Sequence, residues 1–288
     1  MNLLYINWDV SPIIFDNGLP LRWYGIFLVI GFAIAAYLFR KMVVKEGMNA
    51  DLSDAFIAYT VLWTMVGLRI GHCIFYDWAY FSNHFIEIFI PFVQTPDGWE
   101  FSGYQGLASH GGTIAIILYV LYFSRKHKVN LLWLLDRLAL CIPIAAAFVR
   151  CGNLMNSEII GTITDMPWGF VFMQLAGTNE CCEPRHPAQL YEASVYLLLF
   201  VYQMWYYFMF TKGKVPAGRA VGTLLVVIFT ARFFIEFFKA DQVAFEANMT
   251  LNMGQWLSLP FIVLGIFCLV YSVVKKTIST PHYSTKKR

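Results

Sequence analysis

Charged side chains are scarce in this sequence of 288 residues, in which Asp, Glu, Lys and Arg together make up 14%. An average soluble domain is about 25% charged. Roughly half of that share leaves too few charged side chains to cover the surface of a water-soluble protein of this size. A soluble enzyme, a disordered chain and a nucleic-acid-binding protein with a broad basic face are therefore disfavoured, and we expect no nucleic-acid partner.

Several motifs that mark metal and nucleotide sites are also missing. The six cysteines form no CxxC pair and show no zinc spacing, and no HExxH sequence occurs. The chain has no glycine-rich phosphate loop and no internal repeat of the kind found in many transporters. We therefore predict neither a metal site nor a cofactor.

Apolar residues, in contrast, are abundant at 58% of the chain. A helix that crosses a bilayer needs about 20 mostly apolar residues, and the runs lack the period-two alternation of a membrane barrel. We predict an all-α polytopic membrane protein whose seven transmembrane helices form a single integral membrane domain over residues 1–288. The predicted spans are residues 21–39, 52–75, 110–123, 131–149, 190–210, 221–238 and 255–274.

The distribution of basic residues predicts the orientation, because Lys and Arg are enriched on the cytoplasmic side. Fourteen of the 21 basic residues lie in the segments 40–45, 125–128, 212–219 and 275–288. The alternate segments carry acidic residues instead, which places the N-terminus outside and the C-terminus in the cytoplasm. Two outer-face insertions, about 76–109 and 151–189, contain aromatic residues with Gly and Pro, so we expect these periplasmic loops to be ordered.

Ionisable residues within a span are costly and suggest function. Asp136 and Arg137 lie near the inner end of a span, where a structural pairing is favoured. Arg69 is equally compatible with a structural and a functional role. The full set is Arg69, Asp136, Arg137, Arg150, Glu192, Arg232 and Glu236.

Arg150 and Arg232 reach the same outer level from different spans. Arg150 also begins a dense polar run, and a guanidinium group suits phosphate recognition. A phospholipid headgroup is therefore a physically sensible ligand. The run comprises Arg150, Gly152, Asn153, Asn156, Glu158 and Gly161.

Two histidines lie close to predicted helix starts. A lone histidine at a helix start is typically a hydrogen-bonded structural residue, whereas Gly111 and Gly112 after His110 permit close backbone approach and favour a ligand-facing imidazole, so both roles stay open. His186 precedes the fifth span, where a structural role, which caps the helix and fixes the loop, and a catalytic role remain equally open.

Two other classes of protein could also carry buried arginines and histidines. A channel or transporter for small anions would use Arg69, Arg150 and Arg232, but polar residues confined to the outer half and the missing inverted repeat argue against it. An intramembrane protease using His and Glu is weakened by the absent metal spacing.

The polar runs resemble the motifs of the prolipoprotein diacylglyceryl transferase family. Residues 150–161 read RCGNLMNSEIIG and match that family's R-x-G-N-x-x-N-x-E-x-x-G pattern. The order and spacing of the motifs agree along nearly the whole chain, although Cys151 and the approach to His110 depart from the family pattern. The other matching motifs are residues 22–25, 110–112, 186–192, 232–238 and 253–260.

The resemblance implies a transferase of the bacterial inner membrane, with its active site toward the outer leaflet. Such an enzyme moves the diacylglyceryl group of phosphatidylglycerol onto the lipobox cysteine thiol of a preprolipoprotein. A thioether forms and glycerol phosphate leaves, which is the first step of lipoprotein maturation. The implied partners are therefore the lipid, the signal peptide with its lipobox, and the bilayer.

The resemblance also implies roles for individual residues. Arg150 and Arg232 hold the phosphate, and His110 takes the thiol proton or orients the headgroup together with Tyr24. The thiolate is the nucleophile and an ordinary thiol has a pKa of about 8.5, so a histidine, a tyrosine and a carboxylate all remain possible bases. Glu236 is expected to position Arg232. The remaining substrate-binding residues are Arg69, Gly111, Gly112, Asn153, Asn156, Glu158 and Gly161.

Overall fold

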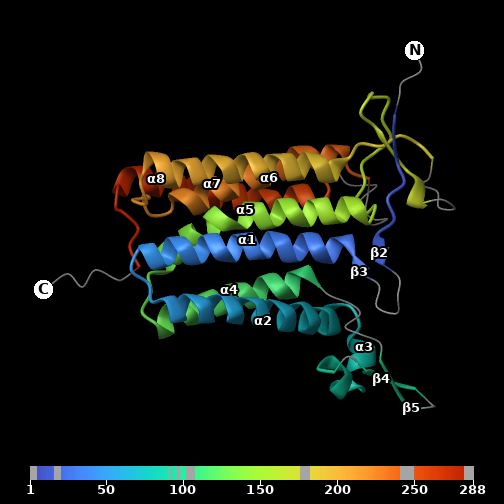
Figure 1. The fold of residues 1–288 in the computed structure, drawn as a ribbon, viewed down its shortest axis with the longest axis horizontal. Helices are drawn as coiled ribbons and strands as arrows, with labels where there is room; N and C mark the ends of the chain where they lie inside the picture. The colour runs from blue at the N-terminus through green and yellow to red at the C-terminus, as the bar shows by residue number, and fades with distance from the viewer. Residues whose placement is uncertain are drawn as a thin grey trace, which may run out of the picture. The chain divides into compact units, whose positions relative to one another are not determined.

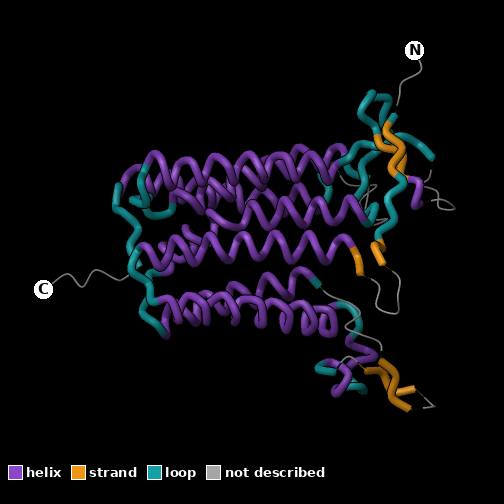
Figure 2. Tube along the Cα trace, viewed as in Figure 1, coloured by secondary structure: helices purple, strands orange, loops and turns teal. Residues whose placement is uncertain are grey.

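The computed structural model describes residues 5–15, 21–90, 92–95, 98–101, 108–175, 182–240 and 250–281. Helices dominate these residues (Figures 1 and 2). The chain divides into two compact units. The first unit comprises Met1–Met42 and Leu135–Ser279, and the second comprises Val43–Leu134 and Thr280–Arg288.

A helix occupies each predicted span. Within the described residues, six of these helices are long and apolar enough to cross a membrane, which confirms an all-α polytopic membrane architecture. The remaining helix, α4, has 18 residues, and its polar first turn and terminal cations lower its mean hydropathy. The helices are α1 (Trp23–Lys45), α2 (Ala50–Phe75), α4 (Ser109–Lys126), α5 (Leu131–Met155), α6 (Ala188–Trp205), α7 (Arg219–Ile235) and α8 (Met253–Lys275).

The first unit holds most of α1 and α5 together with α6, α7 and α8, which run side by side (Figure 1). Helix α7 packs along both α6 and α8. Strand β1 (Ile6–Trp8) pairs in parallel with β6 (Phe170–Phe172), and β2 (Ile13–Phe15) pairs antiparallel with β3 (Leu21–Arg22). A small apolar core around Phe170 and Phe172 lies beside the first pair and supports the segment that follows α5.

The second unit is built on close packing between α2 and α4. A Cβ atom on Gly111 would lie only 2.6 Å from the Cα atom of Gly71, so only glycine permits this approach. Between these helices the chain forms α3 (Trp78–Phe81), the 3-10 turn η1 (Phe85–Ile88) and a hairpin of β4 (Phe92–Thr95) and β5 (Gly98–Phe101). These elements lie within the first predicted outer-face insertion.

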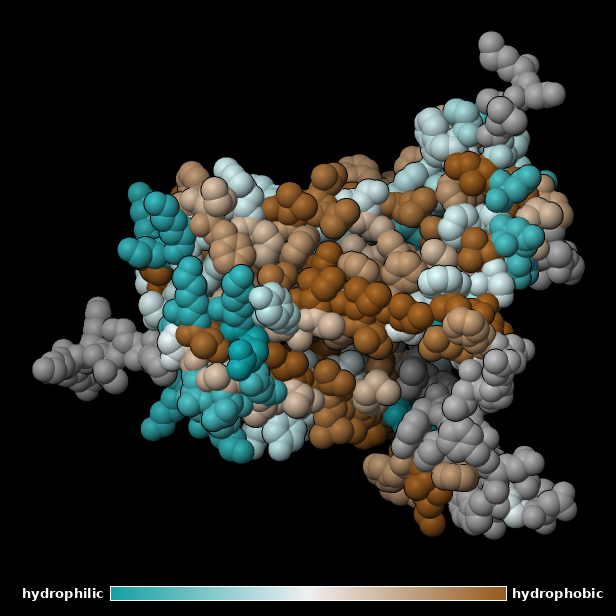
Figure 3. Space-filling model, in the orientation of Figure 1, coloured by the Kyte–Doolittle hydropathy of each residue, from teal (hydrophilic) through white to brown (hydrophobic). Residues whose placement is uncertain are grey.

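The helices present apolar side chains to their surroundings. Val29, Leu198 and Val263 expose 66%, 70% and 67% of their surface. Hydrophobic residues cover the visible middle of the helices, and hydrophilic residues gather near their ends (Figure 3). Exposed apolar surface costs about 25 cal/mol per Å² in water, so these faces suit the hydrocarbon of a bilayer.

Asp136, an ionisable residue within a span, has a structural role in α5. Its Oδ1 atom accepts hydrogen bonds from the backbone N–H groups of Ala220 and Val221, at 3.1 Å each. These groups belong to the first turn of α7, which has no intrahelical partner for them. The adjacent Arg137 guanidinium lies 5.5 Å from the centre of the Tyr207 ring.

Candidate functional site

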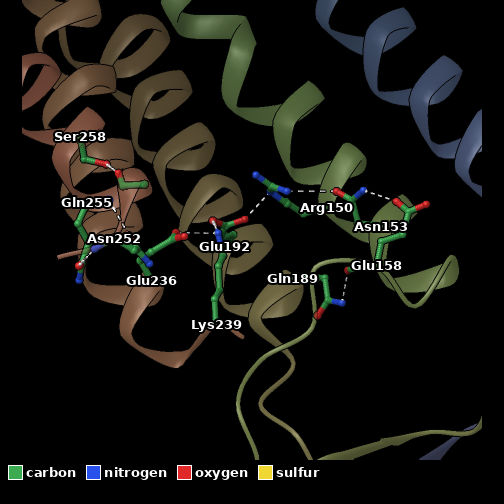
Figure 4. A network of polar contacts seen from close by, with 11 residues as sticks. Arg150, Asn153, Glu158, Gln189, Glu192, Glu236, Lys239, Asn252, Gln255 and Ser258 are labelled. Atoms are coloured by element: carbon green, nitrogen blue, oxygen red, sulfur yellow. Dashed lines mark hydrogen bonds and ion pairs between the residues drawn. The ribbon is translucent and has the colours of Figure 1, made fainter. Parts of the chain in front are cut away.

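Polar side chains from α5, α6 and the end of α7 are joined by a continuous set of contacts in the first unit (Figure 4). These residues are termed the polar network. It comprises Arg150, Asn153, Asn156, Glu158, Gln189, Glu192, Glu236 and Lys239.

Two cations and two carboxylates form the buried part of the network. Glu192 forms ion pairs with both cations: its Oε2 pairs with Nε of Arg150, and its Oε1 accepts from Nζ of Lys239 at 2.8 Å. Lys239 also pairs with Oε2 of Glu236 at 3.1 Å. The side chains of Lys239 and Glu192 are 2% and 1% exposed. Buried charges need such mutual compensation, because removal of one partner leaves an uncompensated charge.

From Arg150 the network continues toward the surface. The guanidinium donates to Oδ1 of Asn153 at 3.2 Å, since residues three apart share one face of α5. Asn153 in turn donates to Oε2 of Glu158 at 3.0 Å, and Asn156 donates to Oε1 of the same carboxylate at 3.1 Å. Both oxygens of the exposed Glu158 side chain are therefore held by amides of the same motif.

The turn after α5 returns Glu158 toward that helix. Ser157 and Ile159 have positive φ angles of 52° and 59°, a conformation that is unusual for a β-branched residue such as isoleucine. The backbone is held by the Glu158 N–H, which donates to the Asn153 carbonyl at 3.0 Å, and by Gln189, whose amide donates to the Glu158 carbonyl at 2.6 Å. Backbone strain of this kind persists where surrounding contacts fix it, and it is concentrated at functional sites.

Tyr24 joins this region from the first turn of α1. Its ring packs against Gly152, where a Cβ atom would lie 2.8 Å from Cδ2 of the ring. The Tyr24 hydroxyl interacts electrostatically with Glu158 and Arg150. The structure thus brings Tyr24 of α1 together with Arg150 of α5 and with Glu158 in the turn after α5.

Arg232 lies in the last turn of α7, and the expected pairing with Glu236 needs correction. Glu236 binds Lys239 instead, because α7 ends at Ile235 and continues as a 3-10 turn over Glu236–Phe238. The Glu236 N–H still donates to the Arg232 carbonyl, and the 3-10 turn that follows brings Lys239, three residues further on, beside the Glu236 carboxylate. Arg232 interacts electrostatically with Tyr196, whose hydroxyl also hydrogen-bonds Arg150.

Gly161 is buried where three segments of backbone cross. Its N–H donates to the carbonyl of His186 at 2.9 Å, and the next residue, Thr162, donates to the carbonyl of Phe238 at 2.8 Å. A Cβ atom on Gly161 would lie 2.6 Å from the Phe238 carbonyl oxygen. Gly161 therefore permits the crossing, and this role is distinct from the expected lining of a headgroup pocket.

His186 is held by an aromatic hydroxyl. Its Nδ1 lies 2.9 Å from the Tyr191 hydroxyl, which also accepts from the Trp168 indole at 2.8 Å. A hydroxyl has one donor and two acceptor lone pairs, so Tyr191 is a partner for Nδ1 of a neutral imidazole in either tautomer. Burial lowers the pKa of His186, which favours that neutral form. This arrangement supports the loop-fixing role that was left open.

The remaining predicted site residues belong to the second unit. Gly111 and Gly112 are buried against α2, and a Cβ atom on Gly112 would lie 2.8 Å from Cδ2 of Leu68. These glycines therefore serve helix packing. His110 is in the first turn of α4 with an exposed side chain.

Arg69 ties α2 to the segment that follows it. Its Nη2 donates to the carbonyl of Glu87 at 2.7 Å, and its Nε donates to the carbonyl of Ile88 at 3.2 Å. The guanidinium carbon also lies 4.9 Å from the centre of the Phe81 ring. These contacts give Arg69 a structural role within the second unit.

Lys239 is the residue that the sequence analysis missed. It is the only lysine of the chain outside the four basic segments, and this isolation was a usable signal. Glu192 was recognised as an ionisable residue within a span but received no role. Over the part of the chain that the structure describes, no group of three or more His, Cys, Asp or Glu residues is arranged to hold a metal ion.

The comparisons with known proteins agree on one family. The family profile described as "Prolipoprotein diacylglyceryl transferase" matches residues 12–271. A Bacteroides fragilis protein named phosphatidylglycerol–prolipoprotein diacylglyceryl transferase is 42% identical over 278 residues, which cover 96% of this chain and 98% of the relative. A protein of the same name from Chloroherpeton thalassium is 39% identical over 93% of this chain and 95% of its own length.

Proposed function

Because the chain belongs to the prolipoprotein diacylglyceryl transferase family, we propose that it transfers the diacylglyceryl group of phosphatidylglycerol to a prolipoprotein cysteine. A carbon–sulfur bond forms, and the bond between the diacylglyceryl carbon and a phosphate oxygen breaks. The electron pair leaves with glycerol phosphate, and the thiol proton passes to a base. The observation that carries the proposal is the match to a transferase of this name over 96% of the chain.

Arg150 is suited to bind the phosphate of the lipid. A guanidinium has five N–H donors. Contacts with Glu192, Asn153 and the Tyr196 hydroxyl use three of them, which leaves two for phosphate oxygens. Because Glu192 and Asn153 fix the group in advance, its charge needs little reorganisation when negative charge develops on the leaving phosphate.

Acceptor atoms beside Glu158 suit the hydroxyl groups of a glycerol headgroup. Among the described residues, the side-chain oxygens of Asn156 and Gln189 are buried and have no hydrogen-bond partner. A buried acceptor without a donor costs roughly 1–3 kcal/mol, and a bound hydroxyl removes that cost. The Glu158 carboxylate offers further acceptor capacity at the exposed end of the network.

The polar network faces the outer leaflet of a bacterial inner membrane in this proposal, with the N-terminus outside and α4 as the seventh span. In the first unit, Arg40, Arg219 and Lys275 belong to the helix ends opposite the network, as the enrichment of cations on the cytoplasmic side requires. Alkaline phosphatase fused after Lys128 tests α4, since the fusion is inactive inside the cell. An active fusion there would contradict the seventh span.

The transfer reaction is tested directly with the purified protein in micelles that contain phosphatidylglycerol. A lipobox peptide should gain the mass of one diacylglyceryl group, whereas the same peptide with serine in place of cysteine should not. His110→Asn and Tyr24→Phe in the same assay identify which of these residues supports proton transfer. No mass gain with the unaltered protein, in micelles where a known transferase is active, would refute the proposal.

A further inference from the structure

Lys239 occupies an unusual environment for a lysine. It follows the 3-10 turn at the end of α7, and its side chain is 2% exposed. Its ammonium group lies between the carboxylates of Glu192, at 2.8 Å, and Glu236, at 3.1 Å. Burial of a lysine is costly unless it is paired, and here each partner belongs to the site.

We propose that Lys239 is a positioning residue that keeps Arg150 available to the phosphate of the lipid. This inference rests on the proposed function. Lys239 acts through Glu192, which lies between the two cations in the network (Figure 4). It does not itself contact the substrate.

Lys239 acts by occupying one of the two carboxylate oxygens of Glu192. One oxygen of Glu192 binds Lys239 and the other binds Nε of Arg150. Without the ammonium group, both oxygens become available to the guanidinium in the bidentate geometry that arginine and carboxylate prefer. A second donor of Arg150 would then be directed away from the phosphate.

The charge of Lys239 has a second consequence. Arg150 and Lys239 balance the charges of Glu192 and Glu236, so loss of Lys239 leaves this group with one excess negative charge. The phosphodiester gains negative charge as glycerol phosphate departs. An added negative charge therefore destabilises the transition state more than the bound lipid, and it lowers kcat more than it raises KM.

Lys239 is itself anchored from several directions. Gly254 in the first turn of α8 packs against Glu236, since a Cβ atom there would lie 2.7 Å from the carboxyl carbon. The positive end of the α8 dipole favours a carboxylate at this position. The backbone of Lys239 forms a bridge with Gly161. Lys239 therefore links both ends of the 150–161 motif, Arg150 through Glu192 and Gly161 through the main chain.

The test compares the full-length variants Lys239→Met, Lys239→Arg, Glu236→Gln and the double variant Lys239→Met/Glu236→Gln. We expect Lys239→Met to lower kcat on the order of tenfold to a hundredfold, below the effect of losing a contacting donor, with a smaller change in KM for phosphatidylglycerol. Lys239→Arg should retain most of the activity, because it preserves the charge. Lys275→Met, at an exposed lysine at the end of α8, is the matched control and should behave as the unaltered protein does.

The double variant distinguishes charge balance from packing. It restores the net charge of the group, so its kcat should exceed that of Lys239→Met at least severalfold, a coupling that a double-mutant cycle measures. A purely structural lysine predicts the opposite, because two lost contacts harm the fold more than one. Unchanged kcat in Lys239→Met, or a double variant no better than the single one, would overturn the inference while leaving the transferase reaction of the unaltered protein established. If Lys239→Met does not fold, Lys239→Gln replaces it in the same cycle.

Discussion

Arg69 belongs to α2 and Arg150 to α5, but the surroundings of these two arginines differ in kind. Arg69 donates to two backbone carbonyls of the segment that follows α2 and lies over an aromatic ring. Arg150 binds the carboxylate of Glu192 and the amide of Asn153, which come from α6 and α5. One arginine fixes a connection within the chain, whereas the other is itself fixed by side chains.

This difference shows what separates a structural cation from a candidate ligand-binding cation. Backbone carbonyls are stationary acceptors, and a cation that satisfies them stabilises a connection between elements. Arg150 is held from the side by Glu192, whose charge is shared with Lys239, so it keeps donors and electrostatic attraction for an anion. The burial of a charge alone is therefore weaker evidence of function than the identity of its partners.

The largest effect is expected for Arg150→Ala. Loss of a donor to developing negative charge lowers the rate roughly 10²–10³-fold, so transfer to the lipobox peptide should fall by that order. Glu192 keeps Lys239 as a partner, and the variant should therefore remain folded in a thermal unfolding scan. Arg125→Ala, at an exposed arginine at the end of α4, should remain fully active. A folded Arg150→Ala that retains the unaltered rate would remove Arg150 from the site.

A smaller effect, and mainly on stability, is expected for Arg69→Met. The carbonyls of Glu87 and Ile88 lose their donor, which costs about 1–3 kcal/mol for a buried acceptor left unpaired. The thermal midpoint should fall, while the rate per folded molecule stays close to that of the unaltered protein. The comparison of the two arginines would fail if Arg69→Met kept its midpoint and lost activity as Arg150→Ala does.

The helical architecture was predictable because it depends on local composition. Apolar runs predicted each of the seven helices, with bounds that differ from the observed ones by at most six residues. The role of Gly111 in the first turn of α4 was not predictable in this way. Gly111 allows close packing against α2, and no local sequence pattern encodes a contact between helices.

The partners of the ionisable residues were less predictable. Spacing of four residues suggested that Glu236 binds Arg232, but the change from α7 to a 3-10 turn assigns it to Lys239. Glu192 reaches Arg150 across the interface of two helices, and its partner depends on how those helices pack. Asp136 likewise caps α7, which begins more than 80 residues later. The sequence identifies such residues because they are ionisable and lie in or beside apolar spans, whereas their partners depend on how the helices pack.

The smallest effect is expected for His186→Asn, and it concerns how stability depends on pH. Like Arg150, His186 is held by a side chain, but its neutral imidazole carries no charge. Burial lowers its pKa in the folded protein, so the unfolded chain binds this proton at a higher pH, near 6.5. Acidification through that range therefore favours unfolding, and the stability present at neutral pH is lost as the pH falls.

We expect His186→Asn, which retains an acceptor for Tyr191 but does not titrate, to weaken the dependence of the thermal midpoint on pH between 7.5 and 5. His127→Asn, at an exposed histidine, should leave that dependence unchanged. Equal pH dependence in His186→Asn and the unaltered protein would show that burial does not hold this ring neutral.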